Sequence, residues 1–281
     1  MSQGLALVLG LGEIGAPIYE MLRAAYGPEI ISAYDPNRPQ ASEIMEALFT
    51  KESAGTTFQF LHICFPETPS FLKDLSEYIL KFKPRFVVIH STVSVGMTSY
   101  LQTRLGEFDD EDNQHRYVNF FYSPVRGNIS DGMPWCLKTY TKYLAGYDSP
   151  LGSTHNVKEH LAGAGFKVKT VNALSSLEKA KLWDLAWYGL NIAFYQELER
   201  ECHPIEYDVV RDFIESTPLE SEGKVQRSVF YGGHIGGHCV MQAIEKILGE
   251  TDVPMLRAVV ESNRRRLREV TFDPSCVLGK S

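Results

Sequence analysis

The sequence predicts an α/β protein in which a parallel-sheet domain is followed by an all-helical domain. In the first two-thirds of the chain, short apolar runs alternate with segments of helical spacing, which is typical of β-α-β units. From Leu174 to Glu201, apolar residues instead recur at three- and four-residue steps with almost no helix breakers. We expect the two domains to span residues 1–172 and 173–281.

Each predicted element rests on a local pattern. The strands are short apolar runs bounded by turn residues, and the helices carry apolar residues on one face. The run "LALVLG" opens the sheet, and Pro66 ends the run "FQFLHICFP". The predicted strands cover residues 5–10, 30–35, 58–66, 85–92, 116–124, 142–147 and 165–171. The predicted helices cover residues 13–25, 71–82, 174–201, 205–216, 239–249 and 254–270.

Composition limits the class of protein. The chain has 281 residues, 44% of them hydrophobic and 22% charged, as in ordinary globular proteins. Its net charge of -7 argues against general nucleic-acid binding. We see no secretory signal and no apolar run that would span a bilayer, and therefore expect a cytoplasmic protein with no membrane partner. The cysteines are odd in number, widely scattered and without a CxxC pair, which favours reduced thiols at Cys64, Cys136, Cys202, Cys239 and Cys276.

The segment after the first predicted strand matches the pattern G-x-G-x-x-G. It consists of Gly10, Leu11, Gly12, Glu13, Ile14 and Gly15. Because it follows a strand and opens a helix, it indicates a dinucleotide-binding turn of the Rossmann type. Gly10 would allow the tight turn, Gly12 the approach of the pyrophosphate, and Gly15 the close packing of helix on strand. The helix N-terminus would offer N–H groups to the phosphates.

Asp35 ends the second predicted strand and indicates which nucleotide the turn binds. A carboxylate accepts hydrogen bonds from the ribose hydroxyls and repels a 2′-phosphate, so it favours NAD over NADP. Arg38 lies close enough in sequence to weaken this preference. Two alternatives remain open: the glycines serve packing alone, or a similar turn binds S-adenosylmethionine. We expect NAD as the cofactor.

A second glycine-rich stretch, "GGHIGGHC", precedes the predicted helix 239–249. Its four glycines require a sharp turn or a close approach, and they are Gly232, Gly233, Gly236 and Gly237. Cys239 follows at the helix N-terminus, a position that favours the thiolate and makes a thiol a better nucleophile. One alternative is a small buried residue that ends a loop. The other is a zinc shared by His234 and His238, but four glycines argue against the required helix, and we expect no metal.

Six stretches resemble, in order and spacing, motifs of a single enzyme family. They are "LVLGLGEIGAPI" (7–18), "STVSVGMT" (91–98), "SPVRG" (123–127), the long helical segment 178–199, "GGHIGGHC" (232–239) and "LRAVVESNRRR" (256–266). The family is that of the nucleotide-sugar (UDP-glucose/GDP-mannose) 6-dehydrogenases, and the resemblance extends over roughly residues 4–268.

This resemblance implies a reaction and residues that carry it. In the family, NAD oxidises a sugar C6 alcohol to an aldehyde, a cysteine captures the aldehyde as a thiohemiacetal, a second hydride leaves, and water cleaves the thioester. By position, Cys239 would be the nucleophile and Lys181 would stabilise negative charge on the reacting oxygen. Thr92 would hold a water or the substrate hydroxyl, and Ser91 would contact the cofactor. The alternative for Lys181 is a lysine that merely extends along a helix surface.

The sequence departs from the family at three positions. Where the family has glutamate, asparagine and aspartate, the chain has Val125, Leu185 and Ala243. These losses should impair thioester hydrolysis more than the first hydride transfer. The family's third domain, which supplies most of the nucleotide-sugar surface, has no counterpart in this sequence, so we expect a smaller or differently held substrate. In the wider 3-hydroxyacid and 6-phosphogluconate dehydrogenase group, a lysine at the position of Lys181 acts alone as acid and base.

We therefore expect an NAD-dependent oxidoreductase that acts on a hydroxyl or aldehyde carbon of a polar, sugar-like or anionic small molecule. Arg126 follows a strand end, and its guanidinium suits a carboxylate or phosphate. Substrate contacts are expected from Arg126, His238, Gly236 and Gly237. The long helix 174–201 predicts a homodimer, as in the resembled family. The competing hypotheses are an S-adenosylmethionine-dependent transferase and a non-catalytic relative that binds a nucleotide for regulation.

Overall fold

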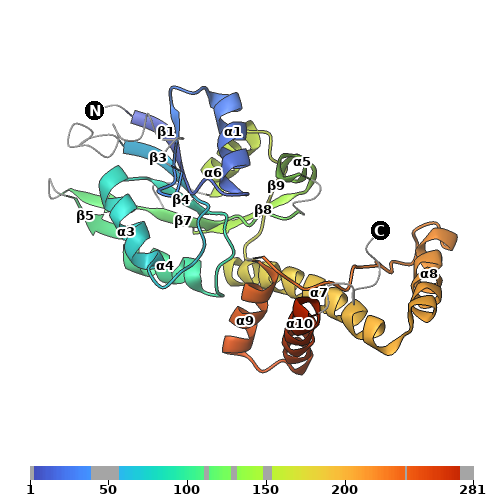
Figure 1. Cartoon of the computed structure of the whole chain (residues 1–281). Coiled ribbons are helices and arrows are strands. Elements are labelled where there is room, and N and C mark those ends of the chain that lie inside the picture. The colour runs from blue at the N-terminus through green and yellow to red at the C-terminus, as the bar shows by residue number, and fades with distance from the viewer. Residues whose placement is uncertain are drawn as a thin grey trace. The chain divides into compact units, whose positions relative to one another are not determined.

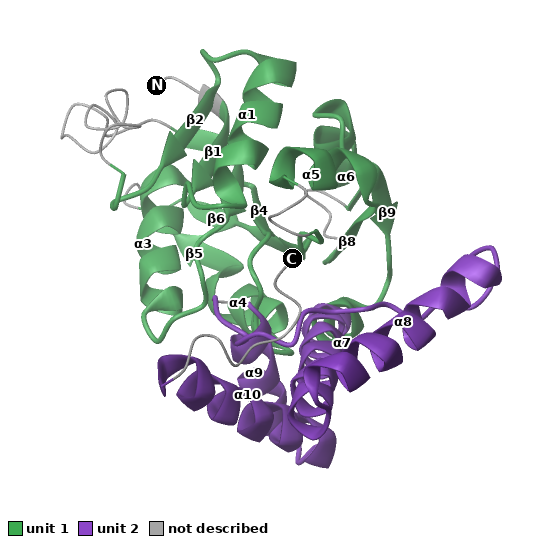
Figure 2. Ribbon diagram, turned by 45° about the vertical axis from the view of Figure 1, so that its right-hand side comes forward, with its two compact units in different colours: residues 1–179 green, residues 180–281 purple. Residues whose placement is uncertain are grey.

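The computed structural model describes residues 3–38, 57–110, 114–127, 132–147, 154–237 and 239–272. The chain divides into two compact units, Met1–Lys179 and Ala180–Ser281 (Figure 2). The division falls within one long helix, several residues after the predicted domain boundary. Each unit is described by itself below.

The first unit is built on a seven-stranded sheet (Figure 1). Its strands, in spatial order, are β2 (Ile31–Tyr34), β1 (Gln3–Leu9), β3 (Thr57–Ile63), β4 (Phe86–Ile89), β7 (Asn119–Tyr122), β8 (Lys142–Gly146) and β9 (Val168–Thr170). All neighbouring strands are parallel except β7 and β8. The chain reverses its direction of progress across the sheet between β1 and β3, and α/β proteins bind ligands at the carboxyl ends of the strands at such a point.

Helices cover both faces of this sheet. On one face, α1 (Gly15–Tyr26), α5 (Met133–Thr139) and α6 (Thr154–Gly163) bury apolar residues against the strands. On the other face, α3 (Phe71–Phe82) and α4 (Met97–Leu105) do the same. All residues of β4 and β7 are buried, as expected of strands covered on both sides. This arrangement confirms the predicted Rossmann-type α/β class.

The antiparallel pairing of β7 with β8 differs from the fully parallel sheet that we expected. The connecting helix α5 has seven residues, so it is about 10 Å long. The chain re-enters the sheet at the edge where it left β7, as shown by the contact between Lys142 at the start of β8 and Ser123 just after β7. The predicted strand 116–124 also divides: β6 (His115–Tyr117) pairs with β5 (Glu107–Asp109) in a separate hairpin.

The second unit is helical in its described part, as predicted. It contains most of α7 (Leu174–Glu201), together with α8 (Pro204–Glu220), α9 (Val240–Glu250) and α10 (Pro254–Phe272). Gly189 of α7 allows a close helix contact, because a Cβ there would lie 2.8 Å from Val240 and 2.9 Å from Ile244 of α9. None of the helices in the described ranges is long and apolar enough to cross a bilayer.

Candidate active site

The glycine turn after β1 is shaped by close contacts within its own unit. Gly10 has φ +88°, and a Cβ there would lie 2.9 Å from the backbone nitrogen of Phe65. A Cβ on Gly15 would lie 1.7 Å from the carbonyl oxygen of Gly10 and 2.9 Å from Cβ of Cys64. Gly10 and Gly15 are therefore required by the fold itself, since no side chain fits at either position.

Gly12 is different, because a Cβ there would have no atom within 4 Å. The fold does not require glycine at this position. An absent side chain beside an open space is what a pyrophosphate needs to approach the backbone at the start of α1. Glu13 is exposed and Ile14 is half-buried against the apolar cluster under α1.

Asp35 holds a carboxylate directly beside this turn. The backbone N–H of Leu11 donates a hydrogen bond to Asp35 Oδ2 at 2.8 Å, and that of Asn37 donates to Oδ1 at 2.9 Å. Each carboxylate oxygen has a further lone pair that can accept a ribose hydroxyl. Asp35 is therefore held against the glycine turn, and its role in binding the ribose stays a prediction.

A cavity of about 810 Å³ opens beside the turn within the first unit. It is lined by Gly12 and Glu13, by the side of α1, by Arg38, by α5 and by residues 163–165. A volume of this size accommodates a small organic ligand. Arg38 and Lys138 are the positive charges along its wall.

Ser91 and Thr92 follow β4 at the carboxyl edge of the sheet. Ser91 is 4% exposed, and its buried Oγ has no hydrogen-bond partner among the described residues. A buried hydroxyl without a partner is costly in a folded protein unless a ligand supplies one. Thr92 is half-buried in the same segment.

Two carboxylates that the sequence analysis did not single out hold the segment after Thr92. Glu67 accepts hydrogen bonds from the backbone N–H of Ser94 at 2.6 Å and from its Oγ at 2.8 Å. Glu178, which is fully buried, accepts from Gly96 N at 2.6 Å and from Thr98 N and Oγ1 at 2.9 and 2.7 Å. A carboxylate at the N-terminus of α4 also complements the helix dipole. The sequence offered one indication of these carboxylates: Glu67 comes just after β3, at the carboxyl edge of the sheet where α/β proteins bind ligands.

Arg126, which we expect to bind an anionic group, is held by contacts within its own unit. Its Nη2 donates to the carbonyl oxygen of Thr141 at 2.9 Å, and its guanidinium lies 5.1 Å from the ring centre of Tyr143 and 5.8 Å from that of Tyr140. Its buried Nε has no partner among the described residues. These contacts fix the side chain along the connection from α5 to β8, and a role in substrate binding stays a prediction.

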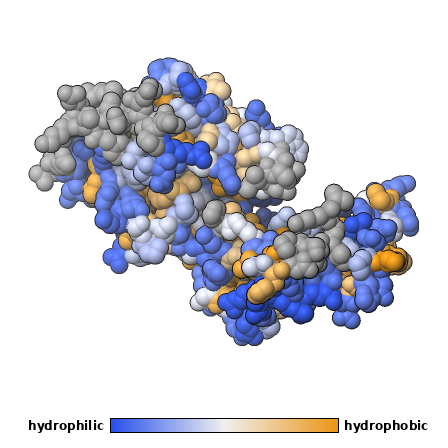
Figure 3. Space-filling view, viewed as in Figure 1, coloured by the Kyte–Doolittle hydropathy of each residue, from blue (hydrophilic) through white to orange (hydrophobic). Residues whose placement is uncertain are grey.

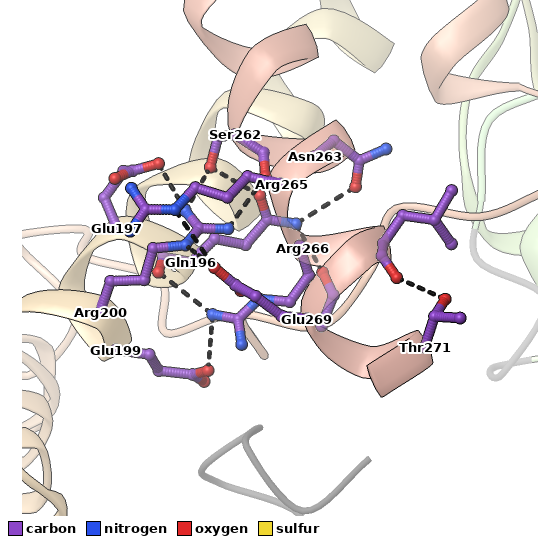
Figure 4. Close-up of polar contacts among 12 residues, drawn as sticks. Gln196, Glu197, Glu199, Arg200, Ser262, Asn263, Arg265, Arg266, Glu269 and Thr271 are labelled. Carbon is purple, nitrogen blue, oxygen red and sulfur yellow. Dashed lines mark hydrogen bonds and ion pairs between the residues drawn. The ribbon is translucent and has the colours of Figure 1, made fainter. Parts of the chain in front are cut away.

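In the second unit, Gln196 of α7 and Asn263 of α10 hold the turn that precedes Cys239. The two side chains lie together, and Gln196 Nε2 is 3.3 Å from Asn263 Oδ1 (Figure 4). Gln196 Nε2 also donates to the carbonyl oxygen of Gly233 at 2.7 Å. Asn263 Oδ1 accepts from the N–H of Ile235 at 2.7 Å, while its Nδ2 donates to the carbonyl oxygen of Ile235 at 3.0 Å. Both amides are buried, and neither was predicted from the sequence.

The glycines of this turn have separate roles. A Cβ on Gly232 would lie 2.8 Å from the backbone of Tyr195, so the turn passes directly against α7. Gly237 has φ +76°, a conformation that favours glycine. Gly236 and Gly237 are exposed, as substrate contact would require. The predicted contact residue His238 lies outside the described residues.

Cys239 occupies the N-cap position of α9 and is exposed. The other described cysteines, Cys64, Cys136 and Cys202, are buried or half-buried, and burial raises the pKa of the Cys64 thiol to about 12. Lys181 is half-buried on α7, about two turns before the Gly189 contact with α9. The two residues predicted to be catalytic therefore belong to the same unit and to helices that touch.

The three departures from the family motifs are apolar residues that are buried or half-buried. Val125 is 4% exposed and belongs to the apolar cluster on the α1 side of the sheet. Ala243 is fully buried in α9, and Leu185 is half-buried in α7. None of these positions offers a group that activates water.

Comparison with known proteins reveals similarity in structure. No protein-family model and no curated protein sequence matches the chain. The UDP-D-ManNAc dehydrogenase from Pyrococcus horikoshii is similar with a TM-score of 0.71 at 18% identity, over 95% of this chain and 70% of that one. The UDP-N-acetyl-mannosamine dehydrogenase from Staphylococcus aureus is similar with a TM-score of 0.66 at 14% identity, over 98% and 70%.

A smaller dehydrogenase is similar along its whole length. The 3-hydroxyisobutyrate dehydrogenase of Mycobacterium tuberculosis, solved with L-serine, has a TM-score of 0.65 at 14% identity, over 99% of this chain and 97% of that one. At these identities the likeness shows the fold. The resemblance seen in the sequence motifs is therefore matched by a shared fold with UDP-sugar dehydrogenases and with a hydroxyacid dehydrogenase.

Proposed function

We propose that this chain is an oxidoreductase that binds a nicotinamide dinucleotide at the turn Gly10–Gly15. The observation that carries the proposal is the contrast within the turn: Gly10 and Gly15 have no room for a side chain, whereas Gly12 borders open space. Asp35 is available to the ribose and Ser91 Oγ lacks a partner among the described residues, so the residues present fit the cofactor. When bound, this cofactor accepts a hydride from a carbon that bears a hydroxyl group.

The substrate that we propose is a polar, sugar-like or anionic small molecule. The similar structures are named for dehydrogenation of UDP-sugars or of 3-hydroxyisobutyrate, which are hydroxyl-bearing anions. In this chain Cys239, Lys181 and Thr92 would be the catalytic residues. Lys181 would stabilise the oxygen as it loses its proton, and the exposed thiol of Cys239 would meet the aldehyde. The apolar residues Val125, Leu185 and Ala243 favour a reaction that ends before hydrolysis.

Ligand-dependent thermal unfolding separates this proposal from its main alternative. A ligand present at a hundred times its Kd stabilises the folded state by about 2.7 kcal/mol. We expect stabilisation by NAD, a smaller effect of NADP because of Asp35, and none by S-adenosylmethionine. Stabilisation by S-adenosylmethionine alone would assign the turn to a transferase.

The catalytic role of Cys239 is testable against a matched cysteine. Formation of NADH from NAD is followed with a panel of sugar alcohols, nucleotide sugars and hydroxy acids. We expect Cys239→Ser and Lys181→Met each to lower turnover by about a hundredfold or more. Cys202→Ser, at a half-buried cysteine after α7, serves as the control and should retain full turnover. Full activity in all three variants would contradict the assignment.

We further propose a homodimer formed through the helical unit. Along α8, Ile205, Val209 and Phe213 recur every fourth residue, with exposed fractions of 81%, 64% and 73%. Figure 3 shows apolar surface over α8. On α7, Trp187 and Phe194 are also more than half exposed. Exposed apolar faces of this kind mark a protein interface, and a second copy fits the long-helix packing expected from the sequence.

A further inference from the structure

Three histidines in the first unit form a single hydrogen-bonded chain beneath α6. His62 lies in β3, His90 follows β4, and His160 lies in α6; they are 0%, 1% and 6% exposed. His62 Nδ1 is 2.9 Å from His90 Nε2, and His62 Nε2 is 3.0 Å from His160 Nε2. His90 Nδ1 in turn lies 3.0 Å from the carbonyl oxygen of Ser123, just after β7. No motif in the sequence points to this chain.

The Ser123 end of this row of histidines determines which ring nitrogens carry hydrogens. A carbonyl oxygen only accepts, so His90 Nδ1 carries the hydrogen and, in a neutral ring, His90 Nε2 accepts. His62 must then donate from Nδ1 and accept at Nε2. His160 consequently donates from Nε2. Three neutral rings therefore have a single compatible set of tautomers.

The surroundings keep these rings neutral. Burial lowers the pKa of His62 and of His90 well below 6.5, and it lowers the pKa of His160 to about 3. The buried ammonium of Lys142 on β8, which donates to the same Ser123 carbonyl at 2.8 Å, adds to the effect on His62 and His90. Phe60 stacks on His160 with ring centres 3.8 Å apart.

The neighbouring titratable groups do not oppose this effect. Tyr26 of α1 stacks on the ring of His160 and donates from its hydroxyl to the His160 carbonyl at 2.6 Å. Burial, with a further contribution from the nearby Glu159, raises the pKa of Tyr26. The thiol of Cys64, at the end of β3, has a pKa of about 12. Both groups therefore stay protonated and uncharged at neutral pH.

The three hydrogen-bonded histidines have a limited capacity for protons. One extra proton on any of the three rings is compatible with every hydrogen bond, because the rings between the protonated ring and the His160 end can change to the other tautomer. A second proton places two N–H groups face to face and breaks a bond. Proton transfer onward is blocked, because the chain ends on a carbonyl oxygen. The nitrogens pair along a line and do not converge, and the described residues contain no group of three side chains suited to a metal.

The residues joined by this chain lie at the cofactor edge of the sheet. His90 directly precedes Ser91, and its backbone N–H donates to Ile63 at the end of β3 at 2.9 Å. The N–H of Ser123 donates to Ile89 at the end of β4 at 2.8 Å. The imidazole chain thus adds a second, side-chain connection between the ends of β3, β4 and β7.

We propose that His62, His90 and His160 are positioning residues: as one chain of neutral rings, they hold the ends of β4 and β7, and with them Ser91, in the geometry that receives the dinucleotide. The expected effect on dinucleotide binding rests on the proposed nicotinamide-dinucleotide function. The histidine chain itself and its effect on Ser91 can be measured without any ligand.

The first test uses the full-length wild-type chain with ¹⁵N-labelled histidine. Long-range ¹H–¹⁵N spectra should show Nδ1–H tautomers for His62 and His90 and an Nε2–H tautomer for His160, with no titration of these rings near pH 6.5. Titration of any of the three near that pH, or an Nε2–H tautomer at His90, would overturn the proposal. His155, an exposed histidine on α6, provides the internal reference.

The second test measures backbone amide exchange and NADH affinity in variants. His62→Phe removes the central ring, and we expect about tenfold faster exchange at residues 90–92 and 123, with unchanged exchange in α9 and α10, and about tenfold weaker NADH binding. His160→Gln keeps a donor for His62 and should remain within about twofold of the wild type, as should the control His155→Gln. Wild-type exchange at residues 90–92 in His62→Phe would overturn the proposal. Failure of NADH to bind any form, together with the expected spectra and exchange, would overturn the proposed function and leave the positioning role supported.

Discussion

The two units each carry a glycine-rich turn that leads into a helix N-terminus, and the two turns are held in different ways. Around Gly10–Gly15, the constraint comes from backbone contacts within the β1–α1 connection and from Cys64, Phe65 and Asp35. Around Gly232–Ile235, it comes from two buried amides on α7 and α10. The first turn is specified mainly by its own glycines, and the second by side chains far away in sequence.

Acidification should distinguish the two units most strongly. The folded-state pKa values of His62, His90 and His160 are lowered, so these rings take up protons on unfolding below pH 6.5. Their contribution to stability is therefore complete above about pH 6.5 and falls as the pH decreases toward the folded pKa values. Below about pH 6 the loss approaches about 4 kcal/mol per pH unit for three protons.

In the second unit, the described histidines His203 and His234 are exposed. Hydrogen exchange resolved by unit should therefore show the first unit opening at the higher pH. In His160→Gln the slope of unfolding free energy against pH should decrease by about 1.4 kcal/mol per pH unit. Equal slopes in the variant and the wild type would contradict this account.

Within the first turn, Gly15→Ala should be severely destabilising. The added Cβ overlaps the carbonyl oxygen of Gly10, and relief requires the backbone to move. We expect a loss of about 3 kcal/mol in the free energy of unfolding, measured by urea denaturation. Gly249→Ala is the matched control, because a Cβ added at this helical glycine would meet no other part of the protein within 4 Å. It should be neutral or slightly stabilising.

Within the second turn, the sensitive position is Asn263. Asn263→Ala leaves both the N–H and the carbonyl of Ile235 without their partner in a buried setting. We expect a loss of about 2 kcal/mol and faster amide exchange at residues 233–237. Asn191→Ala, which removes an exposed hydrogen bond on α7, is the control and should cost less than about 0.5 kcal/mol. A similar cost for both variants would mean that Asn263 does not hold the turn.

A substitution on the exposed face of α8 should have the smallest effect on stability, because this face should affect assembly more than folding. Phe213→Glu replaces an exposed phenylalanine and should change the unfolding free energy by less than about 0.5 kcal/mol. Sedimentation equilibrium should show a dimer for the wild type and a monomer for this variant. Glu215→Gln, at an exposed polar residue of the same helix, should remain dimeric. A monomeric wild-type chain would remove the homodimer from the account.

The sequence alone predicts those features whose cause is local. The β1–turn–α1 unit, the buried strands and the long helix α7 follow from patterns within about 30 residues. Helix α4 was not predicted, because its pattern is weak, with Thr98 and Leu101 as its buried residues, and its N-terminus is capped by Glu178 from another part of the chain. The direction of β8 depends on where α5 returns the chain, which no periodicity reveals.

The same reason explains what was missed in the candidate site. His62 looks like one more residue of an apolar strand, and its partners His90 and His160 are 28 and 98 positions away. Gln196 and Asn263 are ordinary polar residues of predicted helices until the fold brings both to residues 233–235. Cys239, by contrast, was predicted as a candidate because the glycine-rich turn before it and the helix after it are adjacent in sequence.

The central claim is that the turn after β1 binds a nicotinamide dinucleotide, and Gly12 tests it most directly. Because a Cβ at Gly12 meets no atom of the protein, Gly12→Ala should leave the free energy of unfolding within about 0.5 kcal/mol of the wild type. The same methyl group would occupy the space that the pyrophosphate needs. A fluorescence titration with NADH should therefore show binding to the wild type and to Gly249→Ala, and at least about tenfold weaker binding to Gly12→Ala. Equal NADH affinity in all three proteins, or none in the wild type, would contradict the account.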